Sequence, residues 1–409
     1  MKVISGARLI DGTNTNAVEE SVVIVNGNKI EYVGDGNGIS IPDDAQVINA
    51  KGFSLLPGLI DCHDHLASFG YDIAGRWHLN EYRSLRDMRI ASVLRQTLYS
   101  GYTTVRDAGG LDAGFRQAID QGLIFGPRLQ VSLSIITPTG GVGDDTSSSG
   151  HTRPGGREPA LPSGVANGPD GMRAKVREMV KAGADVIKLA TTGGASSRPG
   201  LGPKDMVIGR DEIDALVSEA HHLGKKVMCH ALGGPGLRNA IEAGVDSIEH
   251  GAYLDEDPEL LTIMADKGIF LTPTFSVYVY HGEVGTPHGR ERAADMKDHH
   301  IRSVQMALAS GVKVVAGTDA GGWVHGNNAQ EITCLVNAGM TPLQALMAAT
   351  SHASECIGMD KELGTVSVGK EADMVLVEGN PIEDISILEN GTGVKCVMKG
   401  GEIYRNEIG

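Results

Sequence analysis

The feature that most constrains the fold is a regular alternation of short apolar segments with amphipathic segments between residues 58 and 358. Eight apolar segments have the length and composition of buried strands: 59–63, 103–108, 128–132, 186–190, 226–230, 247–251, 269–274 and 312–319. Apolar strands joined by helices are typical of a parallel sheet that is covered on both faces. Repetition of this unit predicts an α/β fold, a closed (β/α)8 barrel of the TIM type.

An open, doubly wound sheet is the alternative arrangement of the same units. Such a sheet usually carries a Gly-x-Gly-x-x-Gly turn after its first strand, where it binds a dinucleotide. The residues after 59–63 contain no such motif. We therefore favour the barrel.

The two ends of the chain read differently from the middle. Residues 1–57 and 359–409 alternate apolar and polar positions between Gly, Asn and Asp turns, which is typical of short strands. We expect these two ends to pair into one small β-sandwich domain. The predicted barrel then spans residues 58–358.

Charge and cysteine content exclude several classes of protein. The net charge is −15 and no Lys/Arg-rich run is present, so we expect no nucleic-acid binding. We see neither a signal peptide nor an apolar run long enough to cross a membrane, so we expect no membrane association. The five cysteines are widely spaced and odd in number, which does not form a disulfide framework. These features predict a cytoplasmic protein.

The first candidate site residues are His63 and His65, at the end of segment 59–63. Alternate residues of a strand point to the same side, so both imidazoles would face one space. In an α/β barrel that space is the mouth at the carboxyl ends of the strands, where active sites lie. Alone, this His-x-His pattern is equally typical of two solvated surface histidines.

Later strand candidates end in further ligand types. Lys188 lies in segment 186–190, and His230, His250 and Asp319 lie at the ends of three others. A Lys or Asp in an apolar strand is costly to bury unless it is paired or bound to a metal. Histidine is the commonest metal ligand, and carboxylates bind the same ions. The set predicts a metal site at the barrel mouth.

This pattern resembles the amidohydrolase superfamily over essentially the whole chain. PGLIDCHDH (57–65), GTDAG (317–321), GMTPLQALMAAT (339–350) and VGKEADMVLVEGNP (368–381) are similar to stretches typical of that superfamily. The resemblance implies two divalent metal ions, with Zn²⁺ favoured and Mn²⁺, Co²⁺ or Fe²⁺ as alternatives. It places one ion on His63, His65 and Asp319, and the other on His230 and His250. Lys188, carboxylated by CO₂, would bridge them.

The mechanism that this resemblance implies is hydrolysis by a hydroxide that bridges the metals. Metal binding lowers the pKa of water, so the hydroxide is available at neutral pH. Asp319 would take the proton from the hydroxide and pass it to the leaving nitrogen. Asp319 is therefore predicted to be both a metal ligand and the catalytic acid–base.

Within the superfamily the chain is most similar to dipeptidases and carboxypeptidases that remove a C-terminal residue, the group that includes Xaa-Pro dipeptidases (prolidases). The resemblance rests on SGYTTVRDAGG (100–110), DVIKLATTGGASS (185–197) and SIEHGAYL (247–254). Relatives often have His where Val142 stands and Tyr where Leu232 stands. Losing these polar groups favours an apolar or imino-acid leaving residue, so we expect prolidase activity.

Residues that contact the substrate are harder to assign from the sequence. Two long Gly/Pro/Ser-rich loops, 133–169 and 191–206, follow barrel strands and are expected at the mouth. We predict that His151 and His325 bind substrate. Weaker candidates for the mouth are Arg153, Arg157, Arg198, Tyr278 and Tyr280.

Other functions stay open at this stage. A carboxypeptidase for other C-terminal residues and a cyclic-amide or lactone hydrolase would share the metal centre. A deaminase is disfavoured because Lys188 is present and no Glu follows His230 within residues 231–236. A non-enzymatic assembly protein is disfavoured because all six ligand positions are filled. We expect a small molecule or dipeptide as substrate, and a homo-oligomer.

Overall fold

The structure is a computed structural model that describes residues 1–13, 16–36, 44–70, 82–146, 148–150, 160–198 and 200–408. Its middle segment contains two parallel sheets. One has the order β13-β12-β11-β10-β9 and the other the order β6-β7-β8. The strands are β6 (Leu59–Asp64), β7 (Tyr102–Asp107), β8 (Arg128–Val131), β9 (Ile135–Ile136), β10 (Ile187–Ala190), β11 (Val227–Ala231), β12 (Ser247–His250) and β13 (Phe270–Thr272).

Seven of the eight predicted strand segments coincide with these strands. The eighth, 312–319, is not a regular strand, but its backbone bonds to both sheets. Val315 N–H donates to the Leu271 carbonyl of β13, and Cys62 N–H of β6 donates to the Ala316 carbonyl. The segment therefore lies between β13 and β6, as the eighth strand of a TIM-like fold would. The short β9, which the sequence did not predict, pairs with β10.

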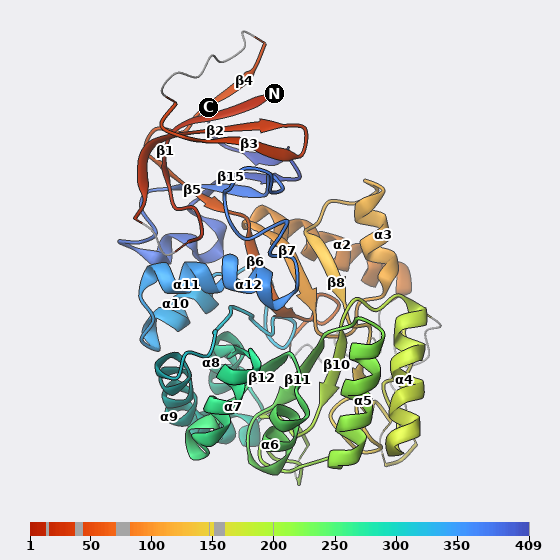
Figure 1. The fold of residues 1–409 in the computed structure, drawn as a ribbon. Coiled ribbons are helices and arrows are strands. Elements are labelled where there is room, and N and C mark those ends of the chain that lie inside the picture. Colours follow the sequence, from red (N-terminus) through yellow and green to blue (C-terminus); the bar gives the residue numbers. More distant parts are fainter. Residues whose placement is uncertain are drawn as a thin grey trace.

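Helices alternate with these strands and lie outside them (Figure 1). Gly183 ends α4 in the left-handed region, φ 103°, which turns the chain back toward β10. Within the described ranges, none of these helices has the length and apolarity needed to span a membrane. The helices are α2 (Arg83–Tyr99), α3 (Ala113–Asp120), α4 (Gly168–Ala182), α5 (Arg210–His222), α6 (Gly234–Ala243), α7 (Glu259–Lys267), α8 (Phe275–Val284), α9 (Pro287–Ala309), α10 (Gln330–Asn337), α11 (Pro342–Ala348) and α12 (Ser351–Cys356), with 3-10 turns η2 (Leu254–Glu256) and η3 (Ile385–Gly391).

Strands from both ends of the chain form one further sheet of eight strands, with the order β16-β15-β14-β5-β1-β2-β3 and β4 paired to β1. The two ends meet where β5 pairs antiparallel with β14, with Leu55 opposite Leu376. The strands are β1 (Lys2–Leu9), β2 (Val18–Asn26), β3 (Lys29–Gly34), β4 (Gln46–Asn49), β5 (Phe53–Pro57), β14 (Met374–Glu378), β15 (Val394–Lys399) and β16 (Glu402–Asn406).

This sheet has a core of its own, separate from the large core between the parallel strands and the helices. Its buried side chains come from both ends of the chain, for example Ile4, Val23, Leu376 and Met398. The sequence predicted a sandwich; the described strands belong to a single hydrogen-bonded sheet around one shared core. The domain boundaries drawn from the sequence stay a prediction.

A buried carboxylate joins the sheet to the parallel strands. Asp373, which precedes β14, accepts a hydrogen bond from Arg128 Nη1 of β8 at 2.7 Å and one from Gly400 N–H at 2.7 Å. Its side chain is only 4% exposed. Its backbone carbonyl also accepts from Gly58 N–H, just before β6. Asp373 therefore fixes the orientation of the sheet against β6 and β8.

Replacing Asp373 by Asn should lower the free energy of unfolding by about 2 kcal/mol, because it removes the charge that a half-buried Arg128 faces. The measurement is urea denaturation followed by circular dichroism. The control is Glu402→Gln in the exposed Lys2–Glu402 pair, where Glu402 is 74% exposed, and where the midpoint should not move. Equal midpoints for the two variants would contradict the role given to Asp373.

Candidate metal centre and active site

All six residues that the sequence selects as metal ligands line one cavity of about 490 Å³. They stand at the carboxyl ends of strands β6, β10, β11 and β12 and of segment 312–319, which is where a TIM-like fold places its chemistry. Two long loops complete the walls, one after β9 and one after β10. The six residues are His63, His65, Lys188, His230, His250 and Asp319.

Three of these residues form a compact group of potential metal-binding atoms. One atom each from His63, His65 and Asp319 lies within 4.8 Å of the others. Asp319 Oδ1 is 3.3 Å from His65 Nε2 and 3.6 Å from His63 Nε2. Two imidazole nitrogens and one carboxylate oxygen are ligands that suit a divalent transition metal.

The other three residues lie beside this group. The ring centroids of His230 and His250 are 4.6 Å apart, and those of His63 and His250 are 5.2 Å apart. Lys188 Nζ lies 3.5 Å from His63 Nε2. Lys188 therefore lies directly against the group formed by His63, His65 and Asp319.

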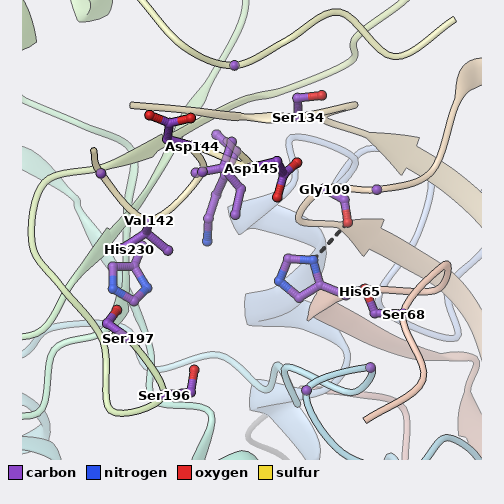
Figure 2. A pocket seen from close by; sticks show the side chains of 18 of the residues that line it. His65, Ser68, Gly109, Ser134, Val142, Asp144, Asp145, Ser196, Ser197 and His230 are labelled. Atoms are coloured by element: carbon purple, nitrogen blue, oxygen red, sulfur yellow. Dashed lines mark hydrogen bonds between the residues drawn. The ribbon is translucent and has the colours of Figure 1, made fainter. Parts of the chain in front are cut away.

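Each imidazole has one nitrogen fixed by a hydrogen bond, which leaves the other free to act as a ligand. His65 Nδ1–H donates to the Gly109 carbonyl at 2.8 Å (Figure 2), and His63 Nδ1–H donates to Glu249 at 2.8 Å. His250 Nδ1 contacts the Thr274 hydroxyl at 2.7 Å, and His230 Nε2 contacts the Gly193 carbonyl at 3.2 Å. Such outer contacts are typical of metal-binding histidines. The donor set therefore fits a metal centre.

Two of the six residues have a strained backbone. His250 has φ 76° and Asp319 has φ 54°, in the left-handed region that side chains other than glycine disfavour. Thr274, which holds His250, is in the same region with φ 57°. Conformations of this kind persist where the surroundings impose them, and they gather at functional sites.

Burial keeps most of the histidines neutral. Burial, and then the neighbouring Lys188, lower the pKa of His63 to about 4 and that of His230 to about 3. Burial also lowers the pKa of His250, and that of Lys188. For His65 burial acts in the same direction, but the contact with Asp319 outweighs it and raises the pKa. Neutral imidazole is the form that binds metals.

Comparison with known proteins identifies the family of this chain. A model of the amidohydrolase family matches residues 54–404. The chain belongs to the amidohydrolase family. It is a hydrolytic enzyme with a parallel α/β fold like that of a TIM barrel and an added sheet.

Individual relatives are similar over most of the chain. Ochratoxinase from Aspergillus niger is 33% identical over 373 residues, which cover 86% of this amidohydrolase and 75% of that protein. The solved structure of a Xaa-Pro dipeptidase with methionine bound in its active site has a TM-score of 0.89 and 33% identity, covering 99% of this chain and 100% of that one. A prolidase complexed with N-methylphosphonate-L-proline has a TM-score of 0.89 and 29% identity, with the same coverage.

Behind the candidate metal ligands of this amidohydrolase lies a buried ion pair that the sequence did not predict. Glu249 on β12 accepts from His63 with one oxygen and from Arg106 Nη2 of β7, at 3.0 Å, with the other. Arg106 Nε also donates to the Cys62 carbonyl at 2.6 Å. Both charged side chains are at most 1% exposed. The available signal was a charged residue in each of the apolar segments 103–108 and 247–251.

A second missed network ties β6 to the segment after Asp319. Asn328 Nδ2 donates to Asp61 at 2.8 Å and to Asp64 at 2.9 Å, the residues that flank His63. The Thr318 hydroxyl donates to Asp61 at 2.7 Å. These contacts fix His63 and Asp319 relative to each other. Asn328 lies in an ordinary loop sequence, and nothing in its neighbours signalled this role.

Helix α8 is capped by a residue that lies far away in the sequence. The hydroxyl of Thr274, which precedes α8, is engaged with His250 and does not cap the helix. Glu331 of α10 accepts instead from the backbone N–H groups of Phe275 and Ser276, at 2.9 and 2.8 Å. The Thr274 side chain is therefore free to hold a candidate metal ligand.

Two residues, His151 and His325, were predicted to bind substrate. His151, with Arg153 and Arg157, lies outside the described residues. His325 is packed behind the site, with Nε2 donating to the Ser68 carbonyl at 2.7 Å, and it is not among the residues that line the cavity. Its contact with substrate stays a prediction.

Of the other positions singled out in the sequence, Arg198 and Val142 line the cavity. Leu232 does not: it is fully buried in a cluster with Ala195 and Met296. The loss of a polar group at this position therefore does not change the cavity wall directly. Tyr278 and Tyr280 pack near Trp323 and are likewise not cavity-lining residues.

The charge of Glu249 should be essential for stability even without metal. In Glu249→Gln, Arg106 stays buried without a counter-ion, and we expect the metal-free protein to lose about 3 kcal/mol of unfolding free energy. Guanidinium denaturation of the chelator-treated protein measures this. The double variant Arg106→Met with Glu249→Gln should recover part of the loss, because it removes the unpaired charge. A single variant as stable as wild type would refute the pairing.

Proposed function

We propose that this amidohydrolase cleaves the amide bond of dipeptides and releases the C-terminal residue, with Xaa-Pro dipeptides as the favoured substrates. The observation that carries the proposal is the group of His63, His65 and Asp319, which opens into a cavity large enough for a small molecule. The fold that supports this site is proposed to be a (β/α)8 barrel over 58–358. Segment 312–319 closes that barrel, and the two chain ends form the second domain.

Two divalent ions, with Zn²⁺ favoured, belong to this proposal. His63, His65 and Asp319 would hold one ion and His230 and His250 the other, with Lys188, carboxylated by CO₂, shared between them. An unmodified Lys188 ammonium would repel both cations, whereas a carbamate offers two anionic oxygens. Bound there, the ions would supply an activated water and polarise the scissile carbonyl.

Asp319 is proposed as the residue that moves the proton. Burial alone would raise the pKa of Asp319, but the contact with His65 and the neighbouring His63 lower it well below its usual value. The carboxylate is therefore ionised and could accept the proton of the attacking hydroxide. It would then return this proton to the leaving nitrogen, so that amide cleavage yields a neutral amine and a carboxylate.

The cavity wall supports an apolar leaving residue. Leu133, Ile135, Val142, Leu161 and Leu201 line the cavity beside the candidate ligands. This apolar part of the wall suits the ring of proline or another apolar side chain. Charged side chains such as Asp144 and Arg198 line other parts of the same cavity. The Xaa-Pro dipeptidase with bound methionine and the prolidase complex with N-methylphosphonate-L-proline each hold a ligand with an apolar side group.

The main alternatives share the metal centre and differ in the substrate. A carboxypeptidase for other C-terminal residues is one, and the chain is also similar to ochratoxinase. A cyclic-amide or lactone hydrolase is another. The expected homo-oligomer and the cytoplasmic location stay predictions.

The proposal is tested by a hydrolysis screen. The protein, produced with Zn²⁺ and bicarbonate, is incubated with a library of Xaa-Xaa dipeptides, and the released amino acids are quantified. We expect Xaa-Pro dipeptides to give the highest kcat/KM. If dipeptides with another C-terminal residue give the highest kcat/KM, the enzyme is a carboxypeptidase for that residue and not a prolidase. If no dipeptide is cleaved, the peptidase function is rejected.

Lys188→Ala should reduce the bound metal from two ions to one per chain and abolish most activity, because the shared ligand is lost. Metal content is measured by inductively coupled plasma mass spectrometry on the dialysed protein. Lys204→Ala, at an exposed lysine that pairs with Glu256, is the control and should retain both ions. Two ions and wild-type activity in Lys188→Ala would reject the bridging role.

A further inference from the structure

Two loops meet over the cavity, and one side chain connects them. Arg198, in the loop after β10, donates from Nη2 to the Gly140 carbonyl, in the loop after β9, at 2.9 Å. Gly140 has φ 82°, and a Cβ there would lie 3.3 Å from Arg198 Nη2. Glycine thus lets the guanidinium approach the backbone closely. Both residues line the cavity.

The loop that carries Arg198 is fixed rather than free. Arg292 of α9 donates to the Gly194 and Ser197 carbonyls at 3.1 and 2.9 Å. His288, also on α9, contacts the same Ser197 carbonyl at 3.1 Å. Arg198 is therefore attached to a segment that helix α9 holds in place.

The same loop lies directly against a candidate metal ligand. A Cβ on Gly194 would lie 3.1 Å from His230 Cε1 and 3.6 Å from the Ser197 hydroxyl. Figure 2 shows Ser197 beside the His230 ring, with Val142 of the opposite loop on the same side of the pocket. The position of Arg198 is thus fixed relative to His230.

The guanidinium keeps hydrogen-bonding capacity for a ligand. It has five N–H donors, and the only contact recorded for it, within the part of the chain that the structure describes, is the one to Gly140. The nearby carboxylate of Asp144 is engaged elsewhere, since its two oxygens accept from the Gly140 and Thr146 backbone N–H groups. Among the described residues, the Arg198 guanidinium therefore pairs with no carboxylate.

We propose that Arg198 binds the free carboxylate of the C-terminal residue of the substrate. This inference rests on the proposed function and names the group that selects for a free C-terminus. A guanidinium binds a carboxylate through two parallel hydrogen bonds, which fixes its orientation as well as its position. Val142 and Leu201, which lie close to Gly140 and Arg198 in the chain and line the cavity, would contact the side chain of the same substrate residue.

Two positions singled out in the sequence, Val142 and Leu232, offer no polar group to a substrate carboxylate. Val142 offers no hydrogen bond, and Leu232 is buried away from the cavity. Arg198 supplies the positive charge from the neighbouring loop instead.

The test compares dipeptides that have a free C-terminus with their C-terminal amides. For Ala-Pro and Ala-Pro amide, we expect wild type to prefer the free acid by about 100-fold in kcat/KM, the typical size of a charged hydrogen-bonded contact. Arg198→Met should lose this preference, mainly through a higher KM for the acid and with the amide little changed. Arg198→Lys should keep part of it, because the charge remains and the two-pronged geometry is lost.

Arg173→Met, on the exposed face of α4, is the matched control and should behave as wild type. A free-acid preference that persists in Arg198→Met would overturn the assignment. An equal loss of kcat/KM for the amide would also overturn it, because Arg198 would then support the loop structure and not bind the substrate carboxylate.

A binding measurement separates this inference from the proposed function. L-Proline is titrated into the metal-loaded protein by isothermal calorimetry. We expect about 100-fold weaker binding to Arg198→Met than to wild type. If no dipeptide is cleaved but this difference is found, the peptidase function fails and the carboxylate site stands. If dipeptides are cleaved and L-proline binds both proteins equally, the function stands and the Arg198 assignment fails.

Discussion

The arrangement of the site depends on the hydrogen bonds that the buried carboxylate of Glu249 accepts. It joins β12 to β6 through His63 and to β7 through Arg106, and Arg106 in turn bonds the Cys62 carbonyl next to His63. Three strands are thus connected through one charged pair that has almost no contact with water. Burying two charges is costly, and the cost is offset only when their geometry and hydrogen bonds are complete. The candidate ligand His63 therefore cannot turn without leaving one oxygen of the buried Glu249 carboxylate without its hydrogen bond.

Hydrogen bonds from other parts of the fold hold the remaining candidate ligands in the same way. Asn328 and Thr318 bind the acidic residues around His63, the Gly109 carbonyl fixes His65, and Thr274 fixes His250. Each contact comes from a different strand or loop, so the orientation of the imidazoles is set by the whole fold and not by any one segment. This explains why strained backbone at His250 and Asp319 is tolerated.

The sequence predicted the parts of the structure that depend on local pattern. Apolar runs located seven parallel strands, and the polar residues in these runs and in segment 312–319 include six that line the cavity. The outer partners depend on contacts across the fold: Glu249 meets Arg106 from another strand, and Glu331 caps a helix from α10. Segment 312–319 was expected as a strand, yet it bonds its neighbours irregularly because it must also place Thr318 and Asp319. Leu232 was expected in the pocket wall, but packing beside Ala195 buries it.

The pairing of β5 with β14 has a consequence for how the protein is made. These strands lie next to each other in the sheet but are separated in the sequence by the entire middle segment. On the ribosome, β1 to β5 emerge long before their partners, and the sheet cannot be completed until β14 to β16 have been synthesised. Contacts over such sequence distances slow folding and leave strand edges exposed in the interval. The edge of β5 that pairs with β14 therefore stays without its partner until synthesis of the chain is almost finished.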